Sequence, residues 1–215
     1  MILFGIRSPL VVEFEETLKR LGIEITHAVS VSETPRMIDR SAIVELADFT
    51  PENGANFLSA AFAPMRRAEL IAQARGLGLV LANALIDPHA VVANSVRIGA
   101  GTFINASVTI GGASIIGEGV LINRSASIGH HVLLEDNVSI GPGATLAGGI
   151  RVGHNSVIGA GATVLPDIRI GSNVIVSGGS VVRKHVPDNS LVVGNPAIAK
   201  PFKPRASSLA LQGGE

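Results

Sequence analysis

The sequence contains no cysteine, tyrosine or tryptophan, and only seven phenylalanines. The absence of cysteine excludes disulfide bonds, thiol nucleophiles and cysteine-bound metals. The absence of tyrosine and tryptophan excludes surfaces on which those side chains stack against nucleic-acid bases. Thiol chemistry is therefore not available to this chain.

The chain also lacks a charge imbalance and a long apolar segment. Its 17 basic and 17 acidic residues give a formal net charge of zero, which argues against a general binder of nucleic acid or anionic membranes. No apolar run reaches the ~18 residues that a membrane-spanning helix needs. The apolar start is too short for a signal peptide and has no basic region. We therefore expect no nucleic-acid partner, no membrane partner and a cytoplasmic location.

A six-residue repeat runs without interruption through residues 86–187. Its first position is always Ile, Leu or Val, and its fifth is always small or β-branched. The seventeen first positions are Ile86, Val92, Ile98, Ile104, Ile110, Ile116, Ile122, Ile128, Leu134, Ile140, Leu146, Val152, Ile158, Val164, Ile170, Val176 and Val182. A period of six fits neither a helix nor a long strand, but it fits short strands joined by tight corners. The repeat predicts an all-β parallel β-helix with three faces and between five and six coils.

Glycine occupies the second position of eight repeats, including Gly111 and Gly129. A corner that needs either a positive φ or a close approach of two backbones would select glycine there. The stack has open strand edges at its two ends, and we expect the flanking segments to cover them.

Residues 1–84 are expected to form a small α/β domain of their own. Strand patterns at 2–5, 23–31 and 56–63 alternate with amphipathic helix patterns at 9–22 and 65–77. The second helix is expected to bury three apolar residues and to expose four polar ones. The buried set is Leu70, Ile71 and Ala74, and the exposed set is Arg66, Arg67, Glu69 and Arg75. The alternation predicts a Rossmann-like parallel sheet before a repeat domain at 85–200 and a mobile tail at 201–215.

The order of these parts resembles a known enzyme family. A small Rossmann-like domain is followed by Leu-Ile-Asp-Pro-His-Ala at residues 85–90, uninterrupted hexads, and Val-Val-Gly-Asn-Pro-Ala at residues 192–197. The chain is similar to hexapeptide-repeat sugar acetyltransferases, such as bacterial nucleotide-sugar N-acetyltransferases and sialic acid O-acetyltransferases. The resemblance implies a left-handed β-helix, acetyl-CoA as acyl donor, a sugar-like acceptor and a homotrimer with its sites between subunits. It leaves open whether the acetyl group is transferred to nitrogen or to oxygen.

Histidine is the simplest catalytic group for acyl transfer in this chain. Attack on a thioester needs a base that takes the proton of the acceptor, and histidine is competent near neutral pH. The resemblance places the catalytic histidine at His130, seven residues after Asn123, which is expected to orient the acceptor or the base. His131 stands where the family usually has a carboxylate. We expect the side chains of His130 and His131 to diverge at their corner. Either Glu135, Asp136 or a partner subunit supplies the carboxylate, or the site is tuned differently.

The resemblance also implies where the two substrates bind. Gly148, Ala160 and Gly178 match positions whose main chains contact the pantetheine arm of acetyl-CoA. Three late lysines are candidates for its 3′-phosphate: Lys184, Lys200 and Lys203. In the first domain, Gly5, Arg7 and Ser8 match a turn that holds the phosphates of a nucleotide-sugar. This turn departs from the family because it has one glycine, no histidine, and a proline at position 9 that removes a donor.

Two other functions remain open at this point. A non-catalytic binding or scaffold protein on the same fold is compatible with His131 and with the atypical turn. A zinc lyase is the other function, since the expected prism also resembles gamma-type carbonic anhydrases, which hold zinc with three histidines from two prisms, but their His-x4-His pair is missing here. We therefore expect an acyltransferase with no bound metal.

Overall fold

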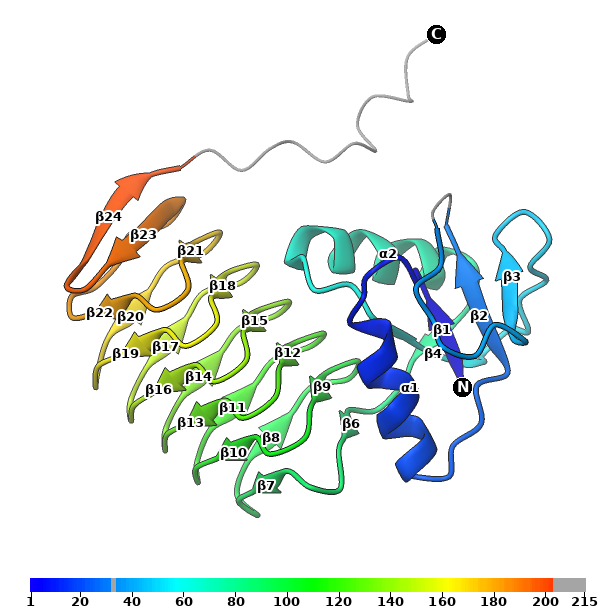
Figure 1. Cartoon of the computed structure of the whole chain (residues 1–215), viewed down its shortest axis with the longest axis horizontal. Coiled ribbons are helices and arrows are strands. Elements are labelled where there is room, and N and C mark those ends of the chain that lie inside the picture. Colours follow the sequence, from blue (N-terminus) through cyan, green and yellow to red (C-terminus); the bar gives the residue numbers. More distant parts are fainter. Residues whose placement is uncertain (32–33, 203–215) are drawn as a thin grey trace, which may run out of the picture.

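A computed structural model describes residues 1–31 and 34–202 of the chain. Figure 1 shows an α/β unit at the N-terminal end, beside a column of short strands that rises away from it. The predicted mobile tail and Lys203 lie outside the described residues, except for positions 201 and 202.

The N-terminal unit is a parallel sheet with one helix on each face. Its elements are β1 (Ile2–Phe4), α1 (Val11–Arg20), β2 (His27–Ser30), β3 (Ile43–Glu45), β4 (Asn56–Ser59), α2 (Pro64–Gly76) and β5 (Val80–Leu81). The sheet order is β3-β2-β1-β4-β5, and all pairs are parallel. Phe14 of α1 belongs to the core that includes Leu3, whereas Leu70 of α2 belongs to the core that includes Phe4. The predicted Rossmann-like sheet is confirmed, with β3 and β5 added as short edge strands.

One prediction for helix α2, the exposure of Arg67, is wrong. Leu70, Ile71 and Ala74 are buried as expected, but Arg67 was predicted to be exposed and its side chain is only 1% exposed. Arg67 lies three and four residues before Leu70 and Ile71, so it shares their face of the helix. Its guanidinium reaches backbone carbonyls of the β-helix instead of solvent.

The repeat forms seventeen two-residue strands, one in each hexad. They are β6 (Leu85–Ile86), β7 (Val91–Val92), β8 (Arg97–Ile98), β9 (Phe103–Ile104), β10 (Thr109–Ile110), β11 (Ile115–Ile116), β12 (Leu121–Ile122), β13 (Ser127–Ile128), β14 (Leu133–Leu134), β15 (Ser139–Ile140), β16 (Thr145–Leu146), β17 (Arg151–Val152), β18 (Val157–Ile158), β19 (Thr163–Val164), β20 (Arg169–Ile170), β21 (Ile175–Val176) and β22 (Val181–Val182). The second residue of each strand is the first residue of a hexad, and from Ile104 onward these residues form one buried core. The predicted parallel β-helix is confirmed.

Three parallel sheets form the sides of this prism. Sheet I is β7-β10-β13-β16-β19-β22, and sheet II is β8-β11-β14-β17-β20. Sheet III contains β6-β9-β12-β15-β18-β21 and ends in the hairpin of β23 (Ser190–Gly194) and β24 (Ala197–Pro201). The chain visits the sheets in the order III, I, II, which defines a III–I corner, a I–II corner and a II–III corner in every coil.

Two reasons were considered for glycine at the second position of the hexad, a positive φ and a close approach of two backbones, and only the second applies. A Cβ on Gly129 would lie 2.6 Å from the backbone carbon of Ala147, in the next coil. Close backbone approach therefore explains glycine at the second position. Positive φ occurs instead at the fourth position, where it is 55° in His131 and 57° in Asn137.

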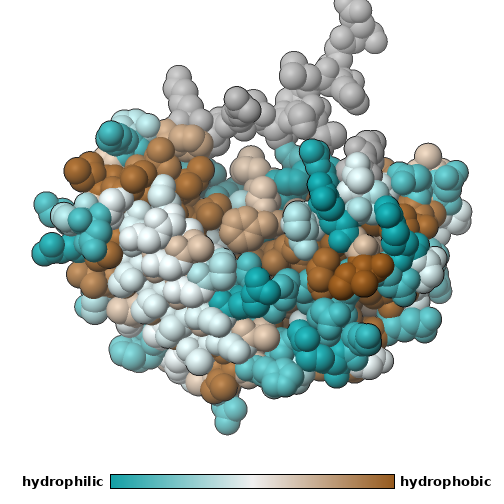
Figure 2. All heavy atoms as spheres, viewed as in Figure 1, coloured by the Kyte–Doolittle hydropathy of each residue, from teal (hydrophilic) through white to brown (hydrophobic). Residues whose placement is uncertain are grey.

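The N-terminal unit packs on the outward face of sheet III over its first four strands, whereas the flanking segments were predicted to cover the open strand edges. The rings of Phe14 and Phe103 pack with their centroids 4.1 Å apart, and Leu85, Leu121 and Ser139 are also buried. The hairpin β23–β24 lies at the other end of the sheet. In the space-filling view, hydrophobic atoms gather at that end of the prism (Figure 2), where Val193 is 51% and Ile198 64% exposed.

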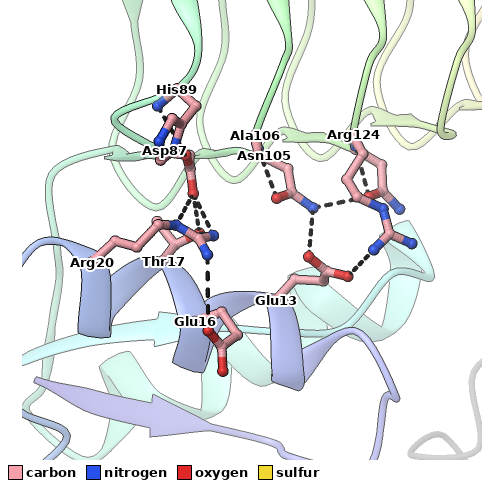
Figure 3. Close-up of polar contacts among 10 residues, drawn as sticks. Glu13, Glu16, Thr17, Arg20, Asp87, His89, Asn105, Ala106 and Arg124 are labelled. Carbon is pink, nitrogen blue, oxygen red and sulfur yellow. Dashed lines mark hydrogen bonds and ion pairs between the residues drawn. The ribbon is translucent and has the colours of Figure 1, made fainter.

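Asp87 joins the two units through a buried cluster (Figure 3). Its carboxylate accepts hydrogen bonds from Thr17 Oγ1 at 2.8 Å and from Arg20 Nη2 at 2.6 Å in α1. It also accepts one from the backbone N–H of His89 at 2.9 Å, and it pairs with that histidine's ring. Burial by itself raises the pKa of Asp87, but the hydrogen bonds from His89, Thr17 and Arg20 together outweigh it and lower the pKa to about 2.

This cluster predicts an acid-labile junction. Because the folded pKa of about 2 lies below that of an unfolded aspartate, Asp87 stabilises the fold fully above pH ~4 and loses this effect as the pH falls towards ~2. Asp87→Asn should lower the free energy of unfolding on the order of 2 kcal/mol near pH 6, and the deficit should shrink below pH ~4. Denaturant titrations between pH 2.5 and 6 measure this, with Asp48→Asn, an exposed carboxylate, as control. A deficit that stays constant across that range would contradict the prediction.

Candidate active site

His130 and His131 lie together at the I–II corner between β13 and β14. Their Nδ1 atoms are 2.9 Å apart, and their rings meet edge to face with centroids at 5.1 Å. The expectation that they diverge is therefore wrong. His131 occupies the fourth position of its hexad with φ of 55°, and this left-handed residue turns the chain so that its ring faces that of His130.

This contact restricts the tautomers of the pair. Two facing Nδ1 atoms form a hydrogen bond only if one carries a proton and the other does not. If His130 donates from Nδ1–H, its Nε2 lone pair is free and His131 acts as the acceptor. Both side chains are exposed at the corner, so Nε2 of His130 is accessible to a substrate.

Gly148 makes room for the ring of His130. A Cβ on Gly148 would come within 2.6 Å of Cε1 and 2.8 Å of Nε2 of that ring. The backbone N–H of Gly149 donates to the carbonyl of His130 at 2.9 Å, which holds the two coils in register. Any side chain at position 148 would therefore displace the histidine.

The carboxylates considered as partners of His130 point elsewhere. Asp136 Oδ1 accepts from the backbone N–H of Glu118 at 2.8 Å, and Glu135 Oε2 accepts from that of His154 at 3.1 Å. Both lie at the II–III corner. Within residues 1–31 and 34–202, neither His130 nor His131 pairs with a carboxylate.

Asn123 lies at a different corner, III–I, and is only 8% exposed. Its Oδ1 accepts from the backbone N–H of Arg124 at 2.8 Å and from Asn105 Nδ2 at 3.0 Å. The backbone donor fixes which amide atom is oxygen, and Asn123 borders an adjoining cavity. Figure 3 shows Asn105 and Arg124 converging on Glu13 of α1. Asn105 was missed in the sequence, although it lies one 18-residue coil before Asn123.

The predicted donor-binding positions divide between the same two corners. Gly148 lies at the I–II corner beside His130. Ala160 and Gly178 lie at the III–I corner, where the backbone N–H of Gly179 donates to Ala160 O at 2.8 Å. One strand of sheet I separates the two corners in each coil, so a single prism does not bring the two groups together.

Gly5, Arg7 and Ser8 border a cavity of about 780 Å³ at the carboxyl ends of β1, β2 and β4. The crossovers that follow β1 and β4 pass to opposite faces of the sheet, and such a switch point is where parallel α/β sheets bind ligands. Arg36 and Arg66 also line this cavity. Gly5 has φ of 77°, and a Cβ there would lie 2.4 Å from Leu70 Cδ1.

A smaller cavity of about 300 Å³ continues from this one towards the prism. It is bordered by Glu13, Asn123 and Arg124, and it shares Ser8, Pro9 and Phe62 with the larger cavity. We call the two together the junction groove. It runs from the edge of the sheet to the III–I corner at Asn123.

No group of three or more His, Cys, Asp or Glu side chains suited to a metal occurs among the residues that the structure describes. In the same part of the chain, no helix has the length and apolar character needed to cross a bilayer.

Comparison with known proteins identifies the family. A model of the bacterial transferase hexapeptide (six repeats) matches residues 113–148 and 149–184. A histidine variant of perosamine N-acetyltransferase from Caulobacter crescentus, in complex with CoA and GDP-perosamine, is 30% identical with a TM-score of 0.84. The match covers 93% of this chain and 95% of that one. The chain belongs to the hexapeptide-repeat acetyltransferases. No curated protein sequence matches it.

Two further structures resemble this hexapeptide-repeat enzyme over nearly its whole length. The acetyltransferase domain of PglB from Neisseria gonorrhoeae, in complex with acetyl coenzyme A, is 29% identical, covers 94% of this chain and 98% of that one, and has a TM-score of 0.79. WeeI from Acinetobacter baumannii, at 24% identity and a TM-score of 0.75, covers 93% of this chain and 98% of its own and shows the same fold. The predicted left-handed β-helix and the predicted acyltransferase activity are both confirmed. The scaffold and zinc-lyase alternatives are set aside.

Proposed function

We propose that this enzyme transfers the acetyl group of acetyl-CoA to the amine of a nucleotide-linked amino-sugar, with His130 as general base. The observation that carries this proposal is the junction groove, which joins an arginine-lined sheet edge to Asn123 on the prism. The similar Caulobacter enzyme is an N-acetyltransferase bound to CoA and GDP-perosamine, and its match with this chain spans both units. The expected cytoplasmic location remains part of the proposal.

The larger cavity suits the nucleotide end of such an acceptor. Arg7, Arg36 and Arg66 line it, and guanidinium groups bind phosphate oxygens in bidentate fashion. Ser8 and Phe62 border the passage to the smaller cavity, where the sugar would reach the amide NH2 of Asn123. The single glycine and Pro9 in the β1–α1 turn leave few backbone donors, so arginine side chains take over this role.

His130 is suited to the proton transfer that amide formation needs. Its Nε2 takes a proton from the acceptor amine as the nitrogen attacks the thioester carbonyl, so that a C–N bond forms. Collapse of the tetrahedral intermediate breaks the C–S bond. The proton held by His130 then passes to the departing CoA thiolate, and the base is restored.

His131 orients this base. When it accepts from Nδ1–H of His130 across the 2.9 Å contact, Nε2 of His130 is unprotonated and available as the base. A carboxylate in this position would also stabilise the imidazolium by charge, whereas a neutral imidazole supplies only the hydrogen bond. His131 therefore performs the orienting part of the role that a carboxylate usually has.

A complete site requires a second subunit. His130 and Gly148 lie at the I–II corner, while Asn123, Ala160 and Gly178 lie at the III–I corner. If sheet I of three copies faces a common axis, the I–II corner of one prism lies beside the III–I corner of the next. The outward residues of sheet I suit such packing because all are small or β-branched and uncharged. They are Val91, Thr109, Ser127, Thr145, Thr163 and Val181. We therefore propose a homotrimer with acetyl-CoA bound between neighbouring prisms.

The test is acetyl transfer from acetyl-CoA to GDP-perosamine and other nucleotide-linked amino-sugars, with the corresponding free amino-sugars as controls. Acetyl-CoA should bind with a micromolar-range constant in calorimetry, and a nucleotide-linked acceptor should be used more efficiently than the free sugar. Arg36→Ala should raise the acceptor KM about tenfold or more, because a charge-assisted hydrogen bond contributes about 1.5–3 kcal/mol, and it should leave the acetyl-CoA KM unchanged. Acetyl-CoA binding without transfer to any nucleotide-linked amine would refute the acceptor class, and failure of the folded trimer to bind acetyl-CoA would refute the donor.

A further inference from the structure

Arg67, near the start of α2, is inserted between the N-terminal unit and the prism. Its side chain is 1% exposed, and its five N–H groups donate to six acceptors, so that two acceptors of Nη2 share one N–H. The acceptors are the carbonyls of Gly119 (2.6 Å), Ala61 (2.7 Å), Phe62 (3.0 Å), Asn137 (2.7 Å) and Val138 (3.1 Å), and Ser139 Oγ (2.9 Å). These groups come from the segment between β4 and α2 and from two successive coils of the prism.

All six acceptors of this cation are neutral. Burial lowers the pKa of Arg67 to about 9, so the guanidinium remains charged near neutral pH at a desolvation cost. A buried charge is weak evidence for stability, because well-packed apolar residues often stabilise a fold as well or better. The guanidinium instead fixes the positions of its acceptors relative to one another, because its planar group holds N–H donors in several directions at once.

The position that Arg67 fixes is that of Phe62. The carbonyl of Phe62 accepts both from Arg67 Nη1 at 3.0 Å and from Ser139 Oγ at 2.7 Å. The same guanidinium holds Gly119 O and Asn137 O at the II–III corners of the prism. Phe62 borders both cavities of the junction groove. The wall of the groove is thus connected to the prism by Arg67, which spans several prism carbonyls, and by the direct hydrogen bond from Ser139.

We infer that Arg67 is a positioning residue that sets the junction groove against the prism and thereby places the acceptor for the acyl transfer. This inference rests on the proposed function, because it assigns the groove to the acceptor. Arg67 borders neither cavity of the groove and does not hydrogen-bond His130, so it acts through Phe62. Lysine cannot replace it, because a single ammonium nitrogen does not reach the acceptors of Nε, Nη1 and Nη2 at once.

Arg67→Lys and Arg67→Met test this role, with Arg75→Ala as a matched control. Arg75 is on the same helix and also contacts the prism, through Glu118 at 2.8 and 2.9 Å, but its side chain is 47% exposed. We expect both Arg67 variants to lower kcat/KM for the nucleotide-linked acceptor at least tenfold, with the acetyl-CoA KM within twofold of wild type. Arg75→Ala should leave both substrates within twofold. Hydrogen exchange at residues 60–66 should rise at least tenfold in the Arg67 variants and remain unchanged along sheets I and II.

The outcomes separate this inference from the proposed function. Normal acceptor kinetics and normal exchange in Arg67→Lys would overturn the inference while leaving the enzyme assignment intact. Equal losses for both substrates, together with faster exchange throughout the prism, would also overturn it, since they indicate general destabilisation. If the wild type acetylates no nucleotide-linked amine, the proposed function fails. Exchange at residues 60–66 then still decides whether Arg67 fixes this wall.

Discussion

Replacing His130 with alanine is expected to lower kcat/KM by a factor of about 10²–10⁴, the usual contribution of a general base. The loss should appear mainly in kcat, because the imidazole takes the proton that moves in the transition state. The side chain is exposed at its corner, so its removal should leave the fold intact. Calorimetry should find acetyl-CoA affinity nearly unchanged, and sedimentation should find the same assembly. Steady-state kinetics with a nucleotide-linked amino-sugar measures the effect.

Two other histidines provide the comparison for this variant. His154 is equally exposed but lies at the II–III corner, where it contacts Ser172 Oγ at 3.0 Å, so His154→Ala should retain activity within twofold. His131→Ala should lose less than His130→Ala, because it removes the orienting group and leaves the base. Activity of His130→Ala within a factor of two of wild type would exclude His130 as the base.

The β-helix could be predicted because the residues that specify each strand lie within one six-residue repeat. An aliphatic residue every six positions forces each two-residue strand to point into the same core, and any shift in register would expose it. Every predicted inward position from Ile104 onward is accordingly buried. Gly111 and Gly129 were also identified for a local reason, the close approach of the next coil.

The features that sequence reasoning missed depend on contacts between distant segments. Arg67 has the same helical spacing as Leu70, Ile71 and Ala74, and the periodicity placed it on the buried face. Its charge led to the opposite prediction, because its acceptors on the prism lie 52 to 72 residues away in the chain. The meeting of His130 and His131 depends on the left-handed conformation at the fourth position of a hexad. Among the residues that the structure describes, eight other non-glycine residues also adopt positive φ, including Ser107, Asn137 and Asn189, so residue type does not reveal it.

Two impaired variants should restore activity when they assemble together. His130→Ala disables the I–II corner, and Asn123→Ala removes an amide donor from the III–I corner, a loss of about 1–3 kcal/mol if its partner is left unpaired. By the same reasoning, Asn123→Ala alone should keep less than about a fifth of wild-type activity, and His130→Ala about a hundredth or less. In mixed trimers with sites between neighbours, about one site in four joins an intact I–II corner to an intact III–I corner. Co-expressed and co-purified trimers should therefore regain about a quarter of wild-type kcat.

A second pair of variants makes this result specific to the composite site. Gly148→Val places a side chain where the ring of His130 lies, since even a Cβ would come within 2.6 Å of Cε1, and it therefore disables the same corner as His130→Ala. Mixed trimers of these two variants contain no intact I–II corner, so they should show no gain over the average of their parents. If the site were complete within one subunit, the pair of His130→Ala and Asn123→Ala would behave in this way as well. Gain in the first pair combined with none in the second can arise only if His130 of one prism works beside Asn123 of the next.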